Sequence, residues 1–328
     1  MKLAVAAPRF TAAAIVALVL FGVTYWAFVA TDVGQNMENL AVRGAELRSP
    51  AARAASLERL TQISVLTFAL AITAVFIVGV LRRRPGLGAV VGVIMVLSVV
   101  LAELLKEFLP RPNLVPGPAW ILRNTFPSGS AAVATAIAVG ALLVAPDRLR
   151  WLALALGAPY VAIIGDAIQT SGWHRLSDTF GSTLLVIAVA SAGLAVLARL
   201  DLAQPSPFGR VDRRIRYALF VLALVTLLVG TVILVLVVAF PILRSPEGAR
   251  RAFLQTAFPL FGAGLTIIAL VTFARVIEPF SLGQGRLPGG PMRSGWTDDD
   301  APPQSPEPHG RAVDGRRRWG RSRSGPDQ

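Results

Sequence analysis

Three short stretches of the sequence carry side-chain types that can bind and cleave a phosphate ester. In chain order they contain Lys106 with Arg111, then Ser128-Gly129-Ser130, then His174 with Arg175 and Asp178. Lysine and arginine supply fixed positive charge, and the arginine fork matches the oxygens of a phosphate. A serine-glycine run that opens a helix adds free N–H groups and the helix dipole, which together attract an anion. A histidine four residues before an aspartate can be oriented by that carboxylate and can then act as a nucleophile.

Each stretch taken singly also has a purely structural explanation. Lys106 and Arg111 could extend from an apolar helix end to the membrane interface. Ser128 could serve only as a helix N-cap, and His174 could bond to a loop carbonyl. We favour a shared phosphate site because all three stretches fall at the ends of expected helices, on one side of a membrane.

The composition predicts that these helices lie in a lipid bilayer. Of the 328 residues, 54% are apolar and 16% are charged, whereas a soluble domain carries about a quarter charged residues. We expect an all-α, polytopic membrane helix bundle, because a span in lipid must satisfy its own backbone hydrogen bonds. Eight spans are expected, at residues 10–30, 60–81, 85–102, 129–145, 151–165 (extending to about 170), 179–198, 217–243 and 252–274.

The basic residues in the short loops predict the orientation of the chain. Arg82-Arg83-Arg84 lies in the tight turn between the second and third spans, and such basic turns face the cytoplasm. Alternation from that turn puts both termini in the cytoplasm of a multi-pass protein of the cell membrane. Residues 31–59, 103–128, 171–178 and 244–251 then lie outside, so the expected phosphate site is extracytoplasmic.

Several classes of site and partner are excluded by composition. The chain has no cysteine and only two histidines, His174 and His309, which excludes thiolate and multi-histidine metal centres. The expectation that the protein uses no metal and no other cofactor rests on the family resemblance given below. We assign the net charge of +13 to basic loops that face anionic membrane lipids, rather than to nucleic acid. Residues 279–328 are rich in Gly, Pro, Ser and Arg, which predicts a disordered basic cytoplasmic tail.

The three motifs resemble those of the type-2 phosphatidic acid phosphatase superfamily, the membrane relatives of vanadium haloperoxidases. The resemblance rests on Lys106…Arg111-Pro112 closing the third span, Pro127-Ser128-Gly129 opening the fourth, and His174-x-x-x-Asp178 entering the sixth. It covers about residues 10–200. It therefore implies a six-span phosphatase-like core in residues 1–200, with two additional transmembrane helices in residues 201–278.

The resemblance also implies a metal-independent hydrolase that forms a phosphohistidine intermediate. His174 would attack phosphorus, and Asp178 would support the imidazole. The phosphate would be held by Lys106, Arg111, Ser128, Gly129, Ser130 and Arg175. The implied substrate is a lipid phosphate or pyrophosphate at the outer leaflet, such as phosphatidic acid, phosphatidylglycerol phosphate or a polyprenyl pyrophosphate.

The sequence departs from the family pattern at three places. Ser130 replaces the histidine that protonates the leaving oxygen, and because such an acid contributes roughly 10²–10⁴-fold, we expect slow catalysis. Ala167-Ile168 replaces the Ser-Arg that precedes the third-motif histidine, which leaves Arg175 or Arg123 as candidate substitutes. Lys106 and Arg111 are also two residues closer together than in the commonest form of the first motif.

Two alternatives remain open at this point. The first is a catalytically inactive family member that binds an anionic lipid or a partner protein. The second is proton-coupled transport, which rests on Asp166, an acidic residue well inside an expected span. We prefer to explain Asp166 by a polar contact to Gln169, Ser171 or the outer loops, or by a supporting role near Lys106. The arginines of residues 31–59 are expected on a solvated amphipathic helix.

Overall fold

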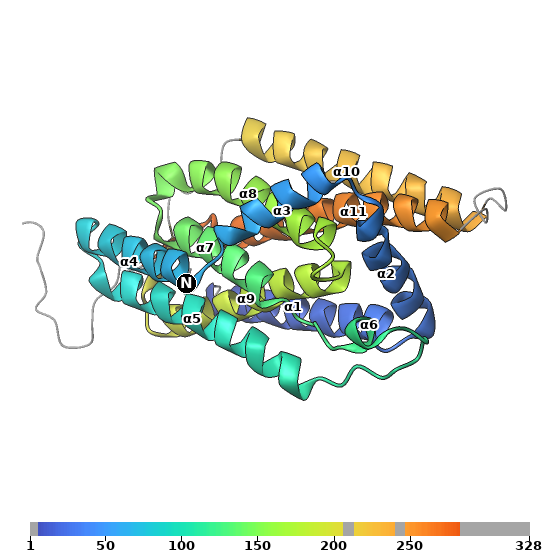
Figure 1. Cartoon of the computed structure of the whole chain (residues 1–328). Coiled ribbons are helices and arrows are strands. Elements are labelled where there is room, and N and C mark those ends of the chain that lie inside the picture. Colours follow the sequence, from blue (N-terminus) through green and yellow to red (C-terminus); the bar gives the residue numbers. More distant parts are fainter. Residues whose placement is uncertain (1–5, 206–212, 240–246, 283–328) are drawn as a thin grey trace, which may run out of the picture. The chain divides into compact units, whose positions relative to one another are not determined.

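The computed structural model describes residues 6–205, 213–239 and 247–282, which all belong to one compact unit, and within them the chain is mainly helical (Figure 1). The helices that coincide with the eight expected apolar runs are α1 (Ala6–Val29), α4 (Val65–Leu81), α5 (Pro85–Phe108), α7 (Gly129–Val144), α8 (Arg150–Thr170), α9 (Leu176–Arg199), α10 (Arg213–Ala239) and α11 (Glu247–Ile277). Shorter elements connect them: α2 (Asp32–Gly44), η2 (Ala45–Leu47), α3 (Pro50–Thr61), α6 (Ala119–Leu122), η3 (Asp147–Leu149), β1 (Ala203–Pro205) and β2 (Phe280–Leu282).

Six helical segments of the described chain are long and apolar enough to cross a membrane, which makes this a multi-pass membrane protein. They are α1, α5, α8 with η3, α9, α10 and α11. The expected span over residues 60–81 is instead broken between α3 and α4, which meet at an angle of 48°. The break follows from Ser64, which caps α4 by accepting a hydrogen bond from Thr67 N at 3.2 Å. The remaining apolar helix, α7, has only 16 residues and is shorter than the six spans.

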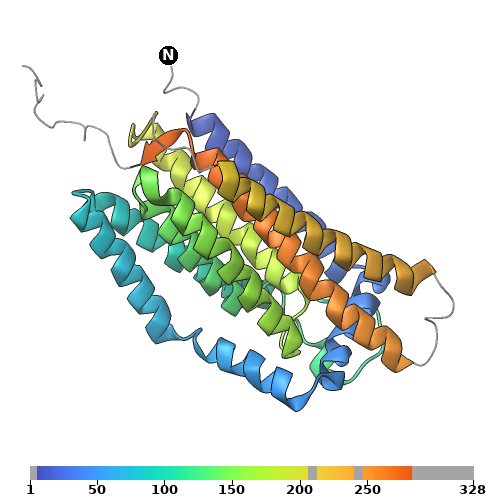
Figure 2. The ribbon, with the colours of Figure 1, turned by 90° about the horizontal axis from the view of Figure 1, so that it is seen from above.

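Helix α9 lies at the centre of the packing and contacts α1, α5, α7 and α11. Small residues allow this close approach. A Cβ at Gly181 would lie 2.4 Å from the ring of Phe126, and a Cβ at Gly193 would lie 2.6 Å from the side chain of Ile94. Helix α10 lies along α11 and is the least buried of the spans (Figure 2). The sequence positions of α9 therefore decide which side chains meet in the interior.

Helix α2 has a buried polar face that the sequence did not indicate, whereas Arg53 and Arg59 on α3 are exposed, as expected for a solvated helix. Thr31 caps the first turn of α2 by accepting from Gly34 N at 3.1 Å. Gln35, Glu38 and Asn39 follow at helical spacing and are all buried. They are buried because α2 packs on α11 and turns this face toward the start of α9.

A two-stranded antiparallel ladder closes the end of the helices that lies opposite the start of α9. Ala203 on β1 pairs with Leu282 on β2. The described chain therefore continues in a regular strand beyond position 279, where we expected the tail to begin, while residues 283–328 lie outside the described part. Helix α11 also packs on α2, α8 and α9, so it belongs to the same compact unit as the expected six-span core.

Candidate functional site

His174 and Asp178 meet at the start of α9. His174 lies in the turn just before this helix, and its Nδ1 is 3.3 Å from Asp178 Oδ2. The aspartate is fully buried, and the histidine side chain keeps 15% of its surface exposed. A proton on Nδ1 would be donated to the carboxylate, which leaves Nε2 with its lone pair. The predicted imidazole–carboxylate pair is therefore present.

Two further donors fix the same carboxylate oxygen. Arg175 N donates to Asp178 Oδ2 at 2.9 Å, and Thr125 Oγ1 donates to it at 2.6 Å. With three groups around one oxygen, the carboxylate cannot turn away from the imidazole without losing these bonds. Thr125 was not among the predicted site residues, because a lone threonine before a proline-containing turn has no distinctive sequence signal.

Arg175 is buried beside this pair, whereas Arg123 is exposed. Of the two candidate substitutes for the missing family arginine, only Arg175 thus belongs to the cluster. Its NH1 donates to Thr125 Oγ1 at 2.7 Å, Nε and NH2 donate to Asn39 Oδ1 at 3.3 and 3.2 Å, and NH2 also donates to the Ile121 carbonyl. Because a guanidinium has five N–H groups, these four bonds leave Arg175 little capacity for a substrate.

Arg111, unlike Arg175, has N–H groups that are not used in hydrogen bonds within the described part of the chain. The loop that carries it is held on both sides, since Tyr25 donates to the Pro110 carbonyl and Gln35 Nε2 donates to the Pro112 carbonyl at 2.7 Å. Its NH1 and NH2 are buried, yet within the described part of the chain neither has a hydrogen-bond partner. Two buried donors on a fixed loop form a site that an anion would complete.

Arg111 lies within electrostatic range of Asp178, the carboxylate of the imidazole–carboxylate pair. Burial, and then the positive charge of Arg175, lower the pKa of Arg111, while Glu38 and Asp178 act in the opposite direction. A second guanidinium this close costs free energy unless negative charge lies nearby. The charges of Arg111 and Arg175 are balanced by Glu38 and Asp178 when both carboxyl groups are ionised, and protonation of Glu38 leaves one positive charge that a phosphate would offset.

Glu38 is a buried carboxylate that was not among the predicted site residues. Both of its oxygens accept bonds from Ser177, one from the backbone N at 2.7 Å and one from Oγ at 3.0 Å. Burial, followed by the charge of Asp178, raises the pKa of Glu38 to about 7. The spacing of Gln35, Glu38 and Asn39 on one helical face was a signal in the sequence, but it does not reveal what that face packs against.

The second motif is tied to the third through the backbone. Ser128 N donates to the Asp178 carbonyl at 3.1 Å, and Ser182 Oγ donates to the carbonyls of both residues at 2.7 Å. Asn124 Nδ2 in turn donates to the carbonyls of Lys106 and Leu109 at 2.9 Å, which fastens the end of α5 to the start of α7. The three predicted stretches do meet at one end of the helices.

Not every predicted phosphate ligand faces the imidazole. Ser128 caps α7 by accepting from Ala131 N at 3.3 Å, so its hydroxyl has the structural role that was the alternative. Lys106 pairs with Glu103 at 2.8 Å beside the start of α7, and no contact joins it to His174 within the described ranges. A Cβ at Gly129 would lie 1.8 Å from Glu103 Oε1, so the Glu103 side chain packs directly over this position. Ser130 is half-buried in the first turn of α7.

Two neighbouring positions carry no phosphate-binding group. Ala167 and Ile168 are buried in an apolar cluster with Leu60, so no cation stands at the positions where the resembled family has an arginine.

Asp166, the basis of the transport alternative, lies within electrostatic range of Arg48 and Arg59 in the connection between α2 and α4. These charges favour an interaction with the outer loops, the alternative to a transport role.

The α11 side of His174 is closed. The cavity there is about 10 Å³ and is lined by Glu38, Gln255 and Phe258 among others. A space of that size has room for about one water molecule, so a phosphate group would have to approach from the side of Arg111.

Among the described residues, no group of three or more His, Cys, Asp or Glu side chains could hold a metal ion. Comparison of the chain with protein-family models, curated proteins and solved structures gives no match.

Proposed function

We propose that this protein is a membrane lipid phosphatase that resembles the type-2 phosphatidic acid phosphatases. Its substrate would be a lipid phosphate or pyrophosphate, held at the outer end of the helices. The observation that carries the proposal is the unpaired, buried guanidinium of Arg111 beside the His174–Asp178 pair. A buried guanidinium whose terminal N–H groups have no partner among the described residues, within electrostatic range of an oriented imidazole–carboxylate pair, fits a site for phosphoryl transfer.

In the proposed reaction, Arg111 binds the phosphate oxygens and His174 Nε2 attacks phosphorus. The bond from phosphorus to the lipid oxygen breaks, and the lipid leaves as its alcohol or monophosphate after gaining a proton. Asp178 stabilises the positive charge that develops on the imidazole. Water then hydrolyses the phosphohistidine and releases inorganic phosphate. We expect the first step to be slow, because Ser130 occupies the position of the family's proton donor and a serine hydroxyl is a poor acid at neutral pH.

The proposed orientation follows from the distribution of arginines. Arg82, Arg84 and Arg150 lie at the end of the helices that carries the β1–β2 ladder, and His174 lies at the other end. Basic residues concentrate on the cytoplasmic side of membrane proteins. The imidazole would therefore face the outer leaflet, where a lipid phosphate can reach it from the headgroup region.

The direct test is release of phosphate by the purified full-length protein from phosphatidic acid, phosphatidylglycerol phosphate and a polyprenyl pyrophosphate in detergent micelles. We expect His174→Ala to reduce the rate by roughly 10³-fold or more, as the loss of a nucleophile does. Trp173→Ala is the matched control, since Trp173 is an exposed neighbour in the same turn. Release that survives the loss of His174 would refute the enzymatic proposal.

A second candidate function is an inactive relative that binds an anionic lipid. It is supported by the hydrogen bonds that occupy Arg175 and by the small cavity beside His174. Native mass spectrometry distinguishes the two. An anionic phospholipid that co-purifies and is lost in Arg111→Gln, together with no phosphate release from any of the three substrates, would favour the binding protein.

A further inference from the structure

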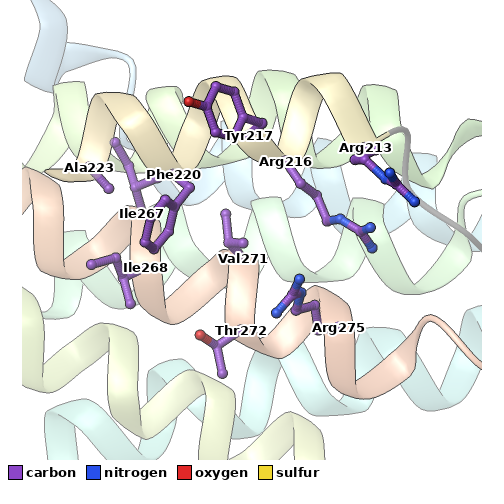
Figure 3. Close-up of a pocket in the computed structure, with 10 residues that line it drawn as sticks. All are labelled: Arg213, Arg216, Tyr217, Phe220, Ala223, Ile267, Ile268, Val271, Thr272 and Arg275. Carbon is purple, nitrogen blue, oxygen red and sulfur yellow. The ribbon is translucent and has the colours of Figure 1, made fainter.

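A groove of about 540 Å³ runs between α10 and α11 at the end of the helices that carries the β1–β2 ladder (Figure 3). Its apolar wall is formed by Phe220 and Ala223 on α10 and by Ile267, Ile268 and Val271 on α11. At one end of the groove these side chains give way to arginines from both helices, as Figure 3 shows. The groove is therefore amphipathic along its length.

The arginine end has a net positive charge. Arg216 is neutralised by Glu278, whose two carboxylate oxygens lie 2.7 and 2.6 Å from its NH1. Arg213 and Arg275 are exposed, and within the described ranges neither forms an ion pair. A third cation is close by, since Arg9 NH2 donates to the Arg275 carbonyl at 2.9 Å.

The groove opens at the level where phospholipid headgroups would lie. Arg150 NH1 lies 3.5 Å from the carbonyl of Ile277, the last residue of α11, and donates to that of Phe280 at 2.6 Å. Arg82 and Arg84 also lie at this end. An end this rich in arginine faces the cytoplasm, whose leaflet carries the anionic lipids. Tyr217 lies at the groove with 70% of its surface exposed, as interfacial aromatic residues do.

We propose that this groove is a binding site for one anionic phospholipid of the cytoplasmic leaflet. The headgroup phosphate lies between Arg213 and Arg275, and an acyl chain follows the apolar wall toward Phe220 and Ile267. Charge complementarity selects the headgroup, and the volume falls in the range of about 300–1,000 Å³ that is typical of ligand pockets. The site is at the opposite end of the helices from His174, so it does not depend on the proposed phosphatase activity.

General attraction of anionic lipid to a basic protein surface is the competing explanation, and matched variants separate the two. Arg213→Gln with Arg275→Gln removes two charges from the groove. Arg83→Gln with Arg199→Gln removes two charges from exposed residues at the same end but outside the groove. A surface effect depends only on the number of charges and would be equal in the two double variants.

The experiment is native mass spectrometry of the full-length protein titrated with dioleoylphosphatidylglycerol or, separately, with dioleoylphosphatidylcholine. We expect the first phosphatidylglycerol to bind the groove variant roughly tenfold more weakly than the unaltered protein. Each interfacial arginine contributes about a fivefold factor in affinity, and the neighbouring cations compensate part of the combined loss. The control variant should match the unaltered protein, and phosphatidylcholine binding should not differ among the three. Equal losses in the two double variants would overturn the proposal.

A second variant tests the apolar part of the groove without changing its charge. Thr272 is an exposed residue that lines the groove, so Thr272→Trp fills part of it. We expect weaker phosphatidylglycerol binding with an unchanged thermal unfolding midpoint. Inorganic phosphate added in excess should not displace the lipid, because it gains nothing from the apolar wall. Unaltered lipid binding by Thr272→Trp, or displacement by phosphate alone, would contradict an acyl chain in the groove.

Discussion

The two ends of the helices bury arginines in different ways. At the end with the β1–β2 ladder, which we call the ladder end, Arg82 donates to the Val144 carbonyl at 2.6 Å. Arg150 there donates to the Phe280 carbonyl at 2.6 Å and its NH2 pairs with Asp147 at 3.1 Å, although its Nε is buried without a hydrogen-bond partner among the described residues. At the end with His174, which we call the imidazole end, Arg111 has both terminal nitrogens buried without a partner among the described residues.

The difference separates a structural role from a ligand-binding role. An arginine that donates to backbone carbonyls at the ends of helices joins chain segments and stabilises the fold. A buried guanidinium without partners costs free energy, and the cost is offset only when an anion binds. The ladder end should therefore contribute to stability, whereas Arg111 should contribute to anion binding.

Removal of the Asp178 charge should have the largest effect on stability. Asp178→Asn removes one of the two buried carboxylates, with Glu38, that offset Arg175 and Arg111, and it leaves Thr125 at most a neutral amide as its partner. Loss of one partner from such a buried charge group costs about 3–5 kcal/mol in the free energy of unfolding. Denaturation in mixed micelles measures it, with Asp201→Asn at an exposed position of the ladder end as the control. A loss no larger than in the control would contradict the electrostatic role of Asp178.

Glu38 should make the imidazole end sensitive to pH. Its pKa is raised in the folded protein from 4.5 to about 7, so the folded state binds a proton more tightly than the unfolded state. Stability from this group is complete below pH 4.5 and is lost as the pH rises through about 7, in total about 3 kcal/mol. Glu38→Gln should keep the bond from Ser177 N and flatten the decline.

The check on Glu38 is the free energy of unfolding measured between pH 4.5 and 8.5. Glu46→Gln removes an exposed carboxylate close to α2 and serves as the control, which should follow the unaltered protein. If Glu38→Gln declined with pH as steeply as that control, Glu38 would not be the titrating group.

The two arginine roles should separate in a paired substitution. Arg82→Gln removes bonds to the Val144 and Ala145 carbonyls at 2.6 and 3.2 Å and should reduce the free energy of unfolding by about 2 kcal/mol. Arg111→Gln removes an unpaired buried cation and should leave stability unchanged or slightly higher. Both are measured by the same denaturation experiment without phosphate. Equal losses in the two variants would remove the distinction between the ends.

The smallest expected effect concerns the proton donor. Ser130→His restores an imidazole at the start of α7 and should raise phosphate release by roughly tenfold, below the full contribution of an evolved general acid. Thr135→His lies farther along the same helix, is fully buried and serves as a negative control for the activity. No gain in Ser130→His would mean that this position is not where the leaving oxygen is protonated.

The sequence predicted the helices well because an apolar run in lipid has few structural options. It also predicted the meeting of His174 with Asp178, which local spacing determines. It did not predict the break at Ser64, although a serine three residues before Thr67 is a recognisable cap. Local signals of this kind could have been used.

The contacts of Glu38, Asn39 and Thr125 could not have been predicted in the same way. The polar face of α2 has the pattern of a solvated helix, and only its packing on α11 shows that the face is buried. Likewise, the type of residue 128 does not distinguish a serine that caps a helix from one that binds phosphate. These assignments depend on tertiary packing, which the spacing of residues within one segment does not determine.

The central claim is that Arg111 belongs to an anion site, and the most direct measurement is the thermal unfolding midpoint as a function of inorganic phosphate. A ligand that binds only the folded state raises the midpoint in a saturable manner. We expect such a rise in the unaltered protein and in Arg82→Gln, after subtraction of the change seen with a salt that contains neither phosphate nor sulfate. We expect no rise in Arg111→Gln. A rise in Arg111→Gln equal to that of the unaltered protein would contradict the claim.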